Sequence, residues 1–252
     1  MASNRLGRVI LILFILTVLV APVWAQEDSP GQDEVSERVR LHLDRGDTHF
    51  RNGQTQEALK AYQQALKIQP ELAEIHYSLG LAYASLKQFP EALAAFQMAA
   101  RLRPTWAKAS NNLGVAYIKM QMWPEAAKAL EKSVKLKPDD AESHYNLGVA
   151  YGKLDRHQQA QAAFEQALKL KPDFVQAQKN LGMAYIKLGR WPEAGKAFQQ
   201  ALKLNPKDAE AHLGLCAFYL NTGDREAAAK EYKLLQELDQ GLAKKFSNLM
   251  QK

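Results

Sequence analysis

Residues 107–140 read AKASNNLGVAYIKMQMWPEAAKALEKSVKLKPDD, and residues 175–208 follow them closely with VQAQKNLGMAYIKLGRWPEAGKAFQQALKLNPKD. Around them, five prolines stand 34 residues apart, at Pro70, Pro104, Pro138, Pro172 and Pro206. Five glycines keep the same period, at Gly46, Gly80, Gly114, Gly148 and Gly182. A fixed period of this length is typical of a solenoid, in which repeated supersecondary units stack on one another.

Each unit contains two helix-like patterns. Setting the periodic proline at repeat position 32 gives six units, namely 39–72, 73–106, 107–140, 141–174, 175–208 and 209–242. Positions 4, 7, 8 and 11 have the spacing of one helix face, and positions 20, 24 and 27 have that of a second. Position 7 is leucine and position 11 is tyrosine in five units, and position 20 is alanine in all six. We therefore expect a pair of helices in every unit.

The recurring glycine, at repeat position 8, needs a physical reason. Glycine inside a helix costs about 1 kcal/mol relative to alanine. We expect it to allow a neighbouring helix backbone to approach closely. Cys216 replaces it in the sixth unit, which predicts a small buried residue.

The repeat positions resemble the tetratricopeptide repeat, whose motif has a large residue at position 4, then Leu-Gly, Tyr, Ala, an aromatic residue, Ala and Pro. The resemblance covers residues 39 to about 242. It implies an all-α fold, a right-handed superhelical solenoid of antiparallel helix pairs. The first unit has Arg45 and His49 in place of Leu and Tyr, as end units of an array often depart from the pattern. Residues 242–252 are expected to form a capping helix.

The resemblance also implies a concave groove, lined by the first helix of each unit through positions 2, 5, 6, 9, 12 and 13. Three asparagines at position 6 can donate and accept hydrogen bonds along a peptide backbone. Three lysines at position 13 suit an acidic segment, and apolar residues at position 9 lie between these rows. The candidate partner-binding residues are Asn112, Asn146, Asn180, Lys119, Lys153, Lys187, Tyr77, Tyr145, Val115, Val149 and Met183. Ordinary solvated surface is the alternative for both polar rows.

Catalysis and cofactor binding have no support in the sequence. It contains no Gly-rich phosphate loop, H-E-x-x-H, C-x-x-C or G-x-S-x-G motif. His76, His144 and His212 share position 4 but stand 68 residues apart, so we expect ring packing and no shared metal. The net charge of +6 is spread along the chain, which argues against nucleic-acid binding.

The N-terminus has the pattern of a secretory signal peptide over residues 1–25. Arg5 and Arg8 precede an apolar run, residues 9–20, and small residues precede a cleavage point after Ala25. An uncleaved membrane anchor is the alternative, and both place the repeats across the membrane, in the periplasm or outside the cell. Residues 26–38 are acidic and are expected to form a disordered linker.

These features predict an exported adaptor or scaffold that binds an extended or helical segment of a protein partner. One alternative is a self-assembling scaffold of the cell envelope, which would make the chain a homo-oligomer. Another is an accessory to an envelope polysaccharide or peptidoglycan enzyme system. A further expectation is that the five carboxylates between residues 26 and 37 occupy the basic groove and inhibit it.

Overall fold

Residues 32–250 are described by a computed structural model, in which thirteen helices and short turns account for this range. The helices are α2 (Gln32–Arg51), α3 (Thr55–Ile68), α4 (Ala73–Ser85), α5 (Phe89–Leu102), α6 (Ala107–Lys119), α7 (Trp123–Leu136), α8 (Ala141–Lys153), α9 (His157–Leu170), α10 (Val175–Lys187), α11 (Trp191–Leu204), α12 (Ala209–Thr222), α13 (Arg225–Leu238) and α14 (Gln240–Met250). None of these helices is long and apolar enough to cross a membrane. The expected signal peptide lies outside the described residues.

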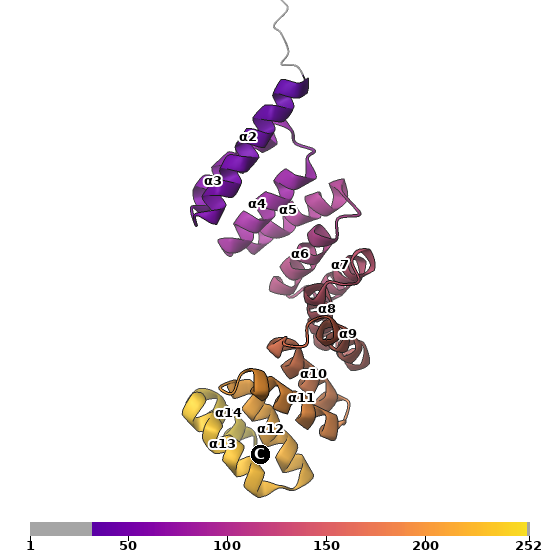
Figure 1. Cartoon of the computed structure of the whole chain (residues 1–252), viewed down its shortest axis with the longest axis vertical. Helices are drawn as coiled ribbons and strands as arrows, with labels where there is room; N and C mark the ends of the chain where they lie inside the picture. The colour runs from indigo at the N-terminus through magenta and orange to yellow at the C-terminus, as the bar shows by residue number, and fades with distance from the viewer. Residues whose placement is uncertain (1–31, 251–252) are drawn as a thin grey trace, which may run out of the picture.

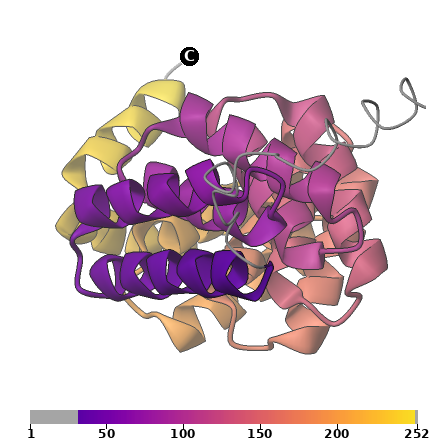
Figure 2. The ribbon, with the colours of Figure 1, turned by 90° about the horizontal axis from the view of Figure 1, so that it is seen from above.

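The helices pack as successive antiparallel pairs, two to a repeat, as the sequence predicts. Each pair contacts the pair before it and the pair after it, which gives the elongated array of Figure 1. Seen end-on, successive pairs turn around the long axis (Figure 2). The buried residues form clusters along the array, so the fold is an all-α solenoid without one central core.

The first helix begins earlier than expected. Residues 32–38, placed in a disordered linker from their composition, form the first two turns of α2. Asp33 and Glu34 lie in its first turn, where carboxylates stabilise the positive end of the helix dipole. Val39 is buried and joins the first cluster of the core. Three of the five carboxylates expected to reach the groove, those of Asp33, Glu34 and Glu37, are therefore part of a helix and not of a free leader.

The position-8 glycines make room for a side chain of the second helix, not for a helix backbone as the sequence had suggested. A Cβ built on Gly148 would lie 2.5 Å from a ring carbon of Phe164, at position 24 of the same repeat. The same holds at Gly182, where it would lie 2.7 Å from Phe198. Cys216 fills this place in the last repeat and is fully buried, which confirms the expected small buried residue.

Helix ends follow the local sequence. Proline lies in the first turn of α5, α7 and α11, where a missing N–H costs nothing, and each periodic proline follows the end of a second helix. The turn inside each repeat has one residue with positive φ, and these residues are Gly53, Lys87, Gln121, Asp155, Gly189 and Gly223. At the C-terminus α14 packs against α12 and α13, with Ala243 buried, in the place expected of a capping helix.

Tyrosines at position 11 join neighbouring repeats. The hydroxyl of Tyr151 donates to Glu131 at 2.8 Å, and that of Tyr185 donates to Glu165 at 2.6 Å. Both carboxylates lie on the second helix of the preceding repeat. Burial first, and then the carboxylate, raise the pKa of each tyrosine to about 12.

Two alanine substitutions within α8 test the role of the position-8 glycine. Gly148→Ala is expected to lower the free energy of unfolding by about 1–3 kcal/mol, because Phe164 must shift. Gly152→Ala is the matched control, since a Cβ there meets nothing within 4 Å and alanine favours the helix by up to about 1 kcal/mol. Thermal and urea unfolding followed by circular dichroism measure both. Equal effects of the two substitutions would contradict the explanation.

Alkaline pH is expected to weaken the tyrosine contacts. The folded state favours the neutral phenol. The contribution of each tyrosine to the stability of the fold is therefore complete below the unfolded pKa of about 10, and it is lost as pH rises towards about 12. Tyr151→Phe should flatten the fall of the melting temperature in this window. Glu131→Gln should lower the pKa of Tyr151 and leave that of Tyr185 in place, which NMR of ring-labelled tyrosine measures. An unchanged pKa of Tyr151 in this variant would refute the contribution of the Glu131 carboxylate.

Candidate protein-binding groove

The first helices of the repeats lie on the inside of the curved array. First helices of adjacent repeats contact one another: α2 with α4, α6 with α8, α8 with α10, and α10 with α12. No comparably extensive contact joins two second helices in the described part of the chain. Helices on the inner side of a bend lie closer together, so this arrangement makes the first helices the lining of the groove.

The asparagine row at position 6 links neighbouring first helices. Asn112 Nδ2 donates to the Tyr77 hydroxyl at 2.9 Å, and Asn180 Nδ2 donates to the Tyr145 hydroxyl at 3.3 Å. Asn146 Nδ2 donates to Asn111 Oδ1 at 3.3 Å. Each acceptor is at position 5 of the preceding repeat. One amide hydrogen of every asparagine thus serves the fold, and the second hydrogen and the carbonyl oxygen remain for a ligand.

The groove tyrosines are held on both sides. Tyr77 packs against Trp106 with ring centroids 4.5 Å apart and planes tilted by 36°, and Tyr145 packs against Phe174 at 4.7 Å with a tilt of 39°. Both phenols are partly buried, and burial raises their pKa. Ring contacts and hydrogen bonds therefore fix the position of both tyrosines. The repeat between them has Asn111 at position 5 in place of tyrosine.

The lysine row at position 13 is exposed. Lys119, Lys153 and Lys187 are the last residues of α6, α8 and α10, where a positive charge stabilises the helix dipole. Within the described residues none of them makes a hydrogen bond or an ion pair. The Lys153 ammonium lies 5.8 Å from the centre of the Trp123 ring. The row therefore offers three charges without an acidic partner of their own.

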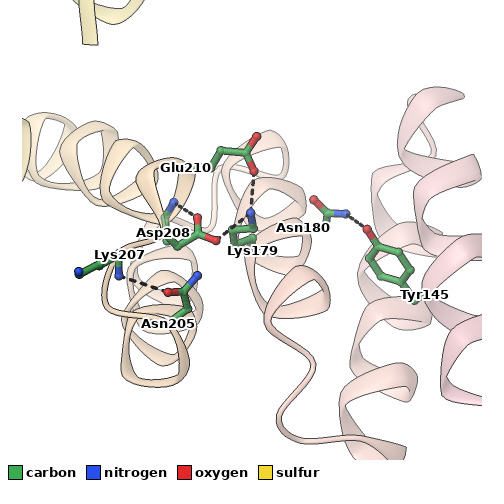
Figure 3. A network of polar contacts seen from close by, with 8 residues as sticks. Tyr145, Lys179, Asn180, Asn205, Lys207, Asp208 and Glu210 are labelled. Atoms are coloured by element: carbon green, nitrogen blue, oxygen red, sulfur yellow. Dashed lines mark hydrogen bonds and ion pairs between the residues drawn. The ribbon is translucent and has the colours of Figure 1, made fainter. Parts of the chain in front are cut away.

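A basic side chain that sequence reasoning missed lies at position 5 of the fifth repeat, directly before Asn180 in the sequence. Lys179 Nζ contacts Asp208 at 3.0 Å and Glu210 at 2.7 Å (Figure 3). Burial opposes its charge, but the hydrogen bonds to Glu210 and Asp208 outweigh burial and raise the pKa of Lys179. Asp208 also accepts from the backbone N–H of Ala211 and so caps α12. This lysine is neutralised, unlike those at position 13.

The apolar floor has a hollow in the fourth repeat. Val115 and Val149 are partly buried, whereas Met183 is 48% exposed. Position 12 is glycine in this repeat, at Gly152, and a cavity of about 250 Å³ opens beside it between α8, α9 and α10. Five of the expected groove residues border this cavity, namely Val149, Lys153, Asn180, Met183 and Lys187.

The position-4 histidines bind the preceding repeat. The Nε2 atoms of His76, His144 and His212 lie 2.7, 2.9 and 3.0 Å from the carbonyl oxygens of the periodic prolines Pro70, Pro138 and Pro206. Their rings thus join the start of one repeat to the end of the preceding repeat. Among the described residues, no group of three or more His, Cys, Asp or Glu side chains is placed to hold a metal ion.

A family profile for the C-terminal domain of cilia and flagella-associated protein 70, a tetratricopeptide-repeat domain, matches residues 17–245. No curated protein is significantly similar in sequence. Among solved structures, PilF of Pseudomonas aeruginosa has a TM-score of 0.72 at 20% identity, over 86% of this chain and 98% of that one. Its likeness shows the fold alone.

Two further structures extend the comparison. YrrB, described as a tetratricopeptide-repeat protein with an unusual peptide-binding site, has a TM-score of 0.66 at 22% identity, over 75% of this chain and 99% of its own. MamA has a TM-score of 0.63 at 30% identity, over 69% of this chain and 96% of its own. With the profile spanning most of the sequence and the repeat contacts above, the chain belongs to the tetratricopeptide-repeat family.

Proposed function

We propose that this chain is an exported adaptor whose groove holds an acidic segment of a partner protein. The observation that carries the proposal is the lysine row: three exposed ammonium groups, without internal acidic partners, border a partly exposed apolar floor. Exposed apolar surface with a polar border is typical of an interaction site. Lysine charges favour a partner with carboxylates and speed its encounter at low salt.

The fixed surroundings of the row support the same function. The asparagine bonds and the packed tyrosines hold the first helices in place before any partner arrives. Such preorganisation lowers the entropy lost on binding. Extended peptides need donors and acceptors for their backbone, and the asparagines retain one N–H and one oxygen each for this purpose.

Export is part of the proposal and rests on residues 1–25. Two arginines, an apolar run too short for a bilayer span of about 20 residues, and small residues before the expected cleavage point are typical of a signal peptide. The groove would then meet partners in the periplasm or outside the cell.

Charge removal in two places tests the groove. The triple variant K119Q/K153Q/K187Q is expected to retain about tenfold less phage from a random peptide library. Each ion pair lost between a lysine and a peptide carboxylate costs about 0.2–1 kcal/mol of binding free energy. The matched control K135Q/K169Q/K203Q removes the same charge from the ends of α7, α9 and α11. Enrichment of bound phage on the immobilised full chain is the readout. If both variants lose the same amount of phage binding, the peptides are attracted by the overall positive charge of the protein and not by the groove.

A reporter fusion tests export. Residues 1–31 joined to alkaline phosphatase should give active enzyme, because its disulfides form only outside the cytoplasm. Ile15→Arg should abolish the activity, since arginine in the apolar run costs about 3 kcal/mol, whereas the control Thr17→Ser should preserve it. An inactive parent fusion would refute export. N-terminal sequencing of the full chain then separates cleavage after Ala25 from an uncleaved anchor.

A further inference from the structure

Position 12 of the groove differs in one repeat. The equivalent residues on either side of Gly152 are Ile118 and Ile186. A Cβ built on Gly152 would meet nothing within 4 Å, so glycine here serves no internal contact. Glycine also weakens a helix by about 1 kcal/mol relative to alanine. Glycine at position 152 leaves the cavity of about 250 Å³ open beside Lys153, the middle lysine of the row.

Five residues of the cavity lining are apolar. Val149 lies on α8, Ala160 and Phe164 on α9, and Met183 and Ala184 on α10. A closed apolar cavity of about 150 Å³ is large enough for a benzene ring. The hollow at Gly152 is thus large enough for one leucine, methionine or phenylalanine side chain. The flexible thioether of Met183, itself 48% exposed, would gain contacts when the hollow is filled.

The border of the cavity is charged. Lys153 and Lys187 stand on it, against one carboxylate, that of Asp155. The Asp155 side chain is 90% exposed and lies 3.7 Å from His157, so it turns to solvent and to the imidazole. Two lysines against one such aspartate leave this border positive. A carboxylate entering beside the hollow would therefore be attracted.

We propose that this cavity selects the partner by one large apolar side chain next to an aspartate or glutamate. The apolar side chain fills the space left by Gly152, and the neighbouring carboxylate pairs with Lys153 and Lys187. This inference rests on the proposed groove function and adds its recognition element. It also assigns Gly152 a binding role that its place in a helix would not suggest.

Selection from the phage library on the full chain tests the pairing. Peptides that bind the unchanged protein are expected to share an acidic residue next to leucine, methionine or phenylalanine. Selection on Gly152→Ile, which restores the residue of the neighbouring repeats, should yield no such motif. Gly152→Ala leaves most of the hollow open and should still select it.

The size of each effect is measured as the affinity of the unchanged chain and of each variant for one selected peptide, synthesised with a fluorescent label. Gly152→Ile should weaken binding by about tenfold or more, the effect of excluding one large apolar side chain. K153Q/K187Q leaves the cavity intact and should weaken binding several-fold at low salt and less at high salt. Lys169→Gln, at the end of α9, is the control and should change nothing. Circular dichroism checks that each variant keeps its helices.

The outcomes separate the two proposals. Peptides that bind Gly152→Ile and the unchanged protein equally well would overturn the inference about the cavity and leave the groove function in place. The same follows if the selected peptides lack the acidic and apolar pair. If the full chain selects no peptides at all, both proposals fail.

Discussion

The contact between the residue at position 8 and the side chain at position 24 sets the distance between the two helices of each repeat. In five repeats the first is glycine, and there is no room for even one more carbon atom. Protein interiors are packed too closely to absorb such an addition without a shift. Because five repeats share this contact and the small side chain of Cys216 takes the place of glycine in the sixth, the helix pairs have similar shapes and stack into a regular curve. The groove is a consequence of this regularity.

Polar contacts between repeats then fix how one pair sits on the next. Asparagines at position 6 bind position 5 of the preceding repeat on the groove side, and tyrosines at position 11 bind its second helix. Histidines at position 4 bind the carbonyl oxygen of the preceding periodic proline in three repeats. The asparagine and tyrosine bonds and that of His212 are partly buried, where an unpaired polar group is costly, whereas those of His76 and His144 are exposed. They stiffen the lining of the groove and leave its lysines free.

The sequence predicted the helix pairs well because their signals are local and repeated. The periodic prolines follow the ends of the second helices, and the periodic glycines lie within the first helices. It did not predict the partners of side chains across repeats, since Asn180 and Tyr145 are 35 residues apart and meet only through the stacking of two units. The start of α2 was missed because its acidic composition is typical of both a linker and a first helical turn. The glycine at 152 was visible in the sequence, but the cavity beside it depends on Phe164 and Met183 from other helices.

Stacked repeats allow one position of a groove to change without cost to the rest. Each unit contacts only its neighbours, so stability is close to a sum of unit and interface terms. Gly152 lies on the lining and makes no packing contact through a side chain, whereas Gly148, one helical turn earlier, lies against Phe164. The same residue type in one helix therefore has two separate roles, one in the fold and one in the shape of the groove. A solenoid can gain a selective hollow by losing a single side chain on its inner face, because the contact of Gly148 with Phe164 that holds the two helices together does not involve position 152.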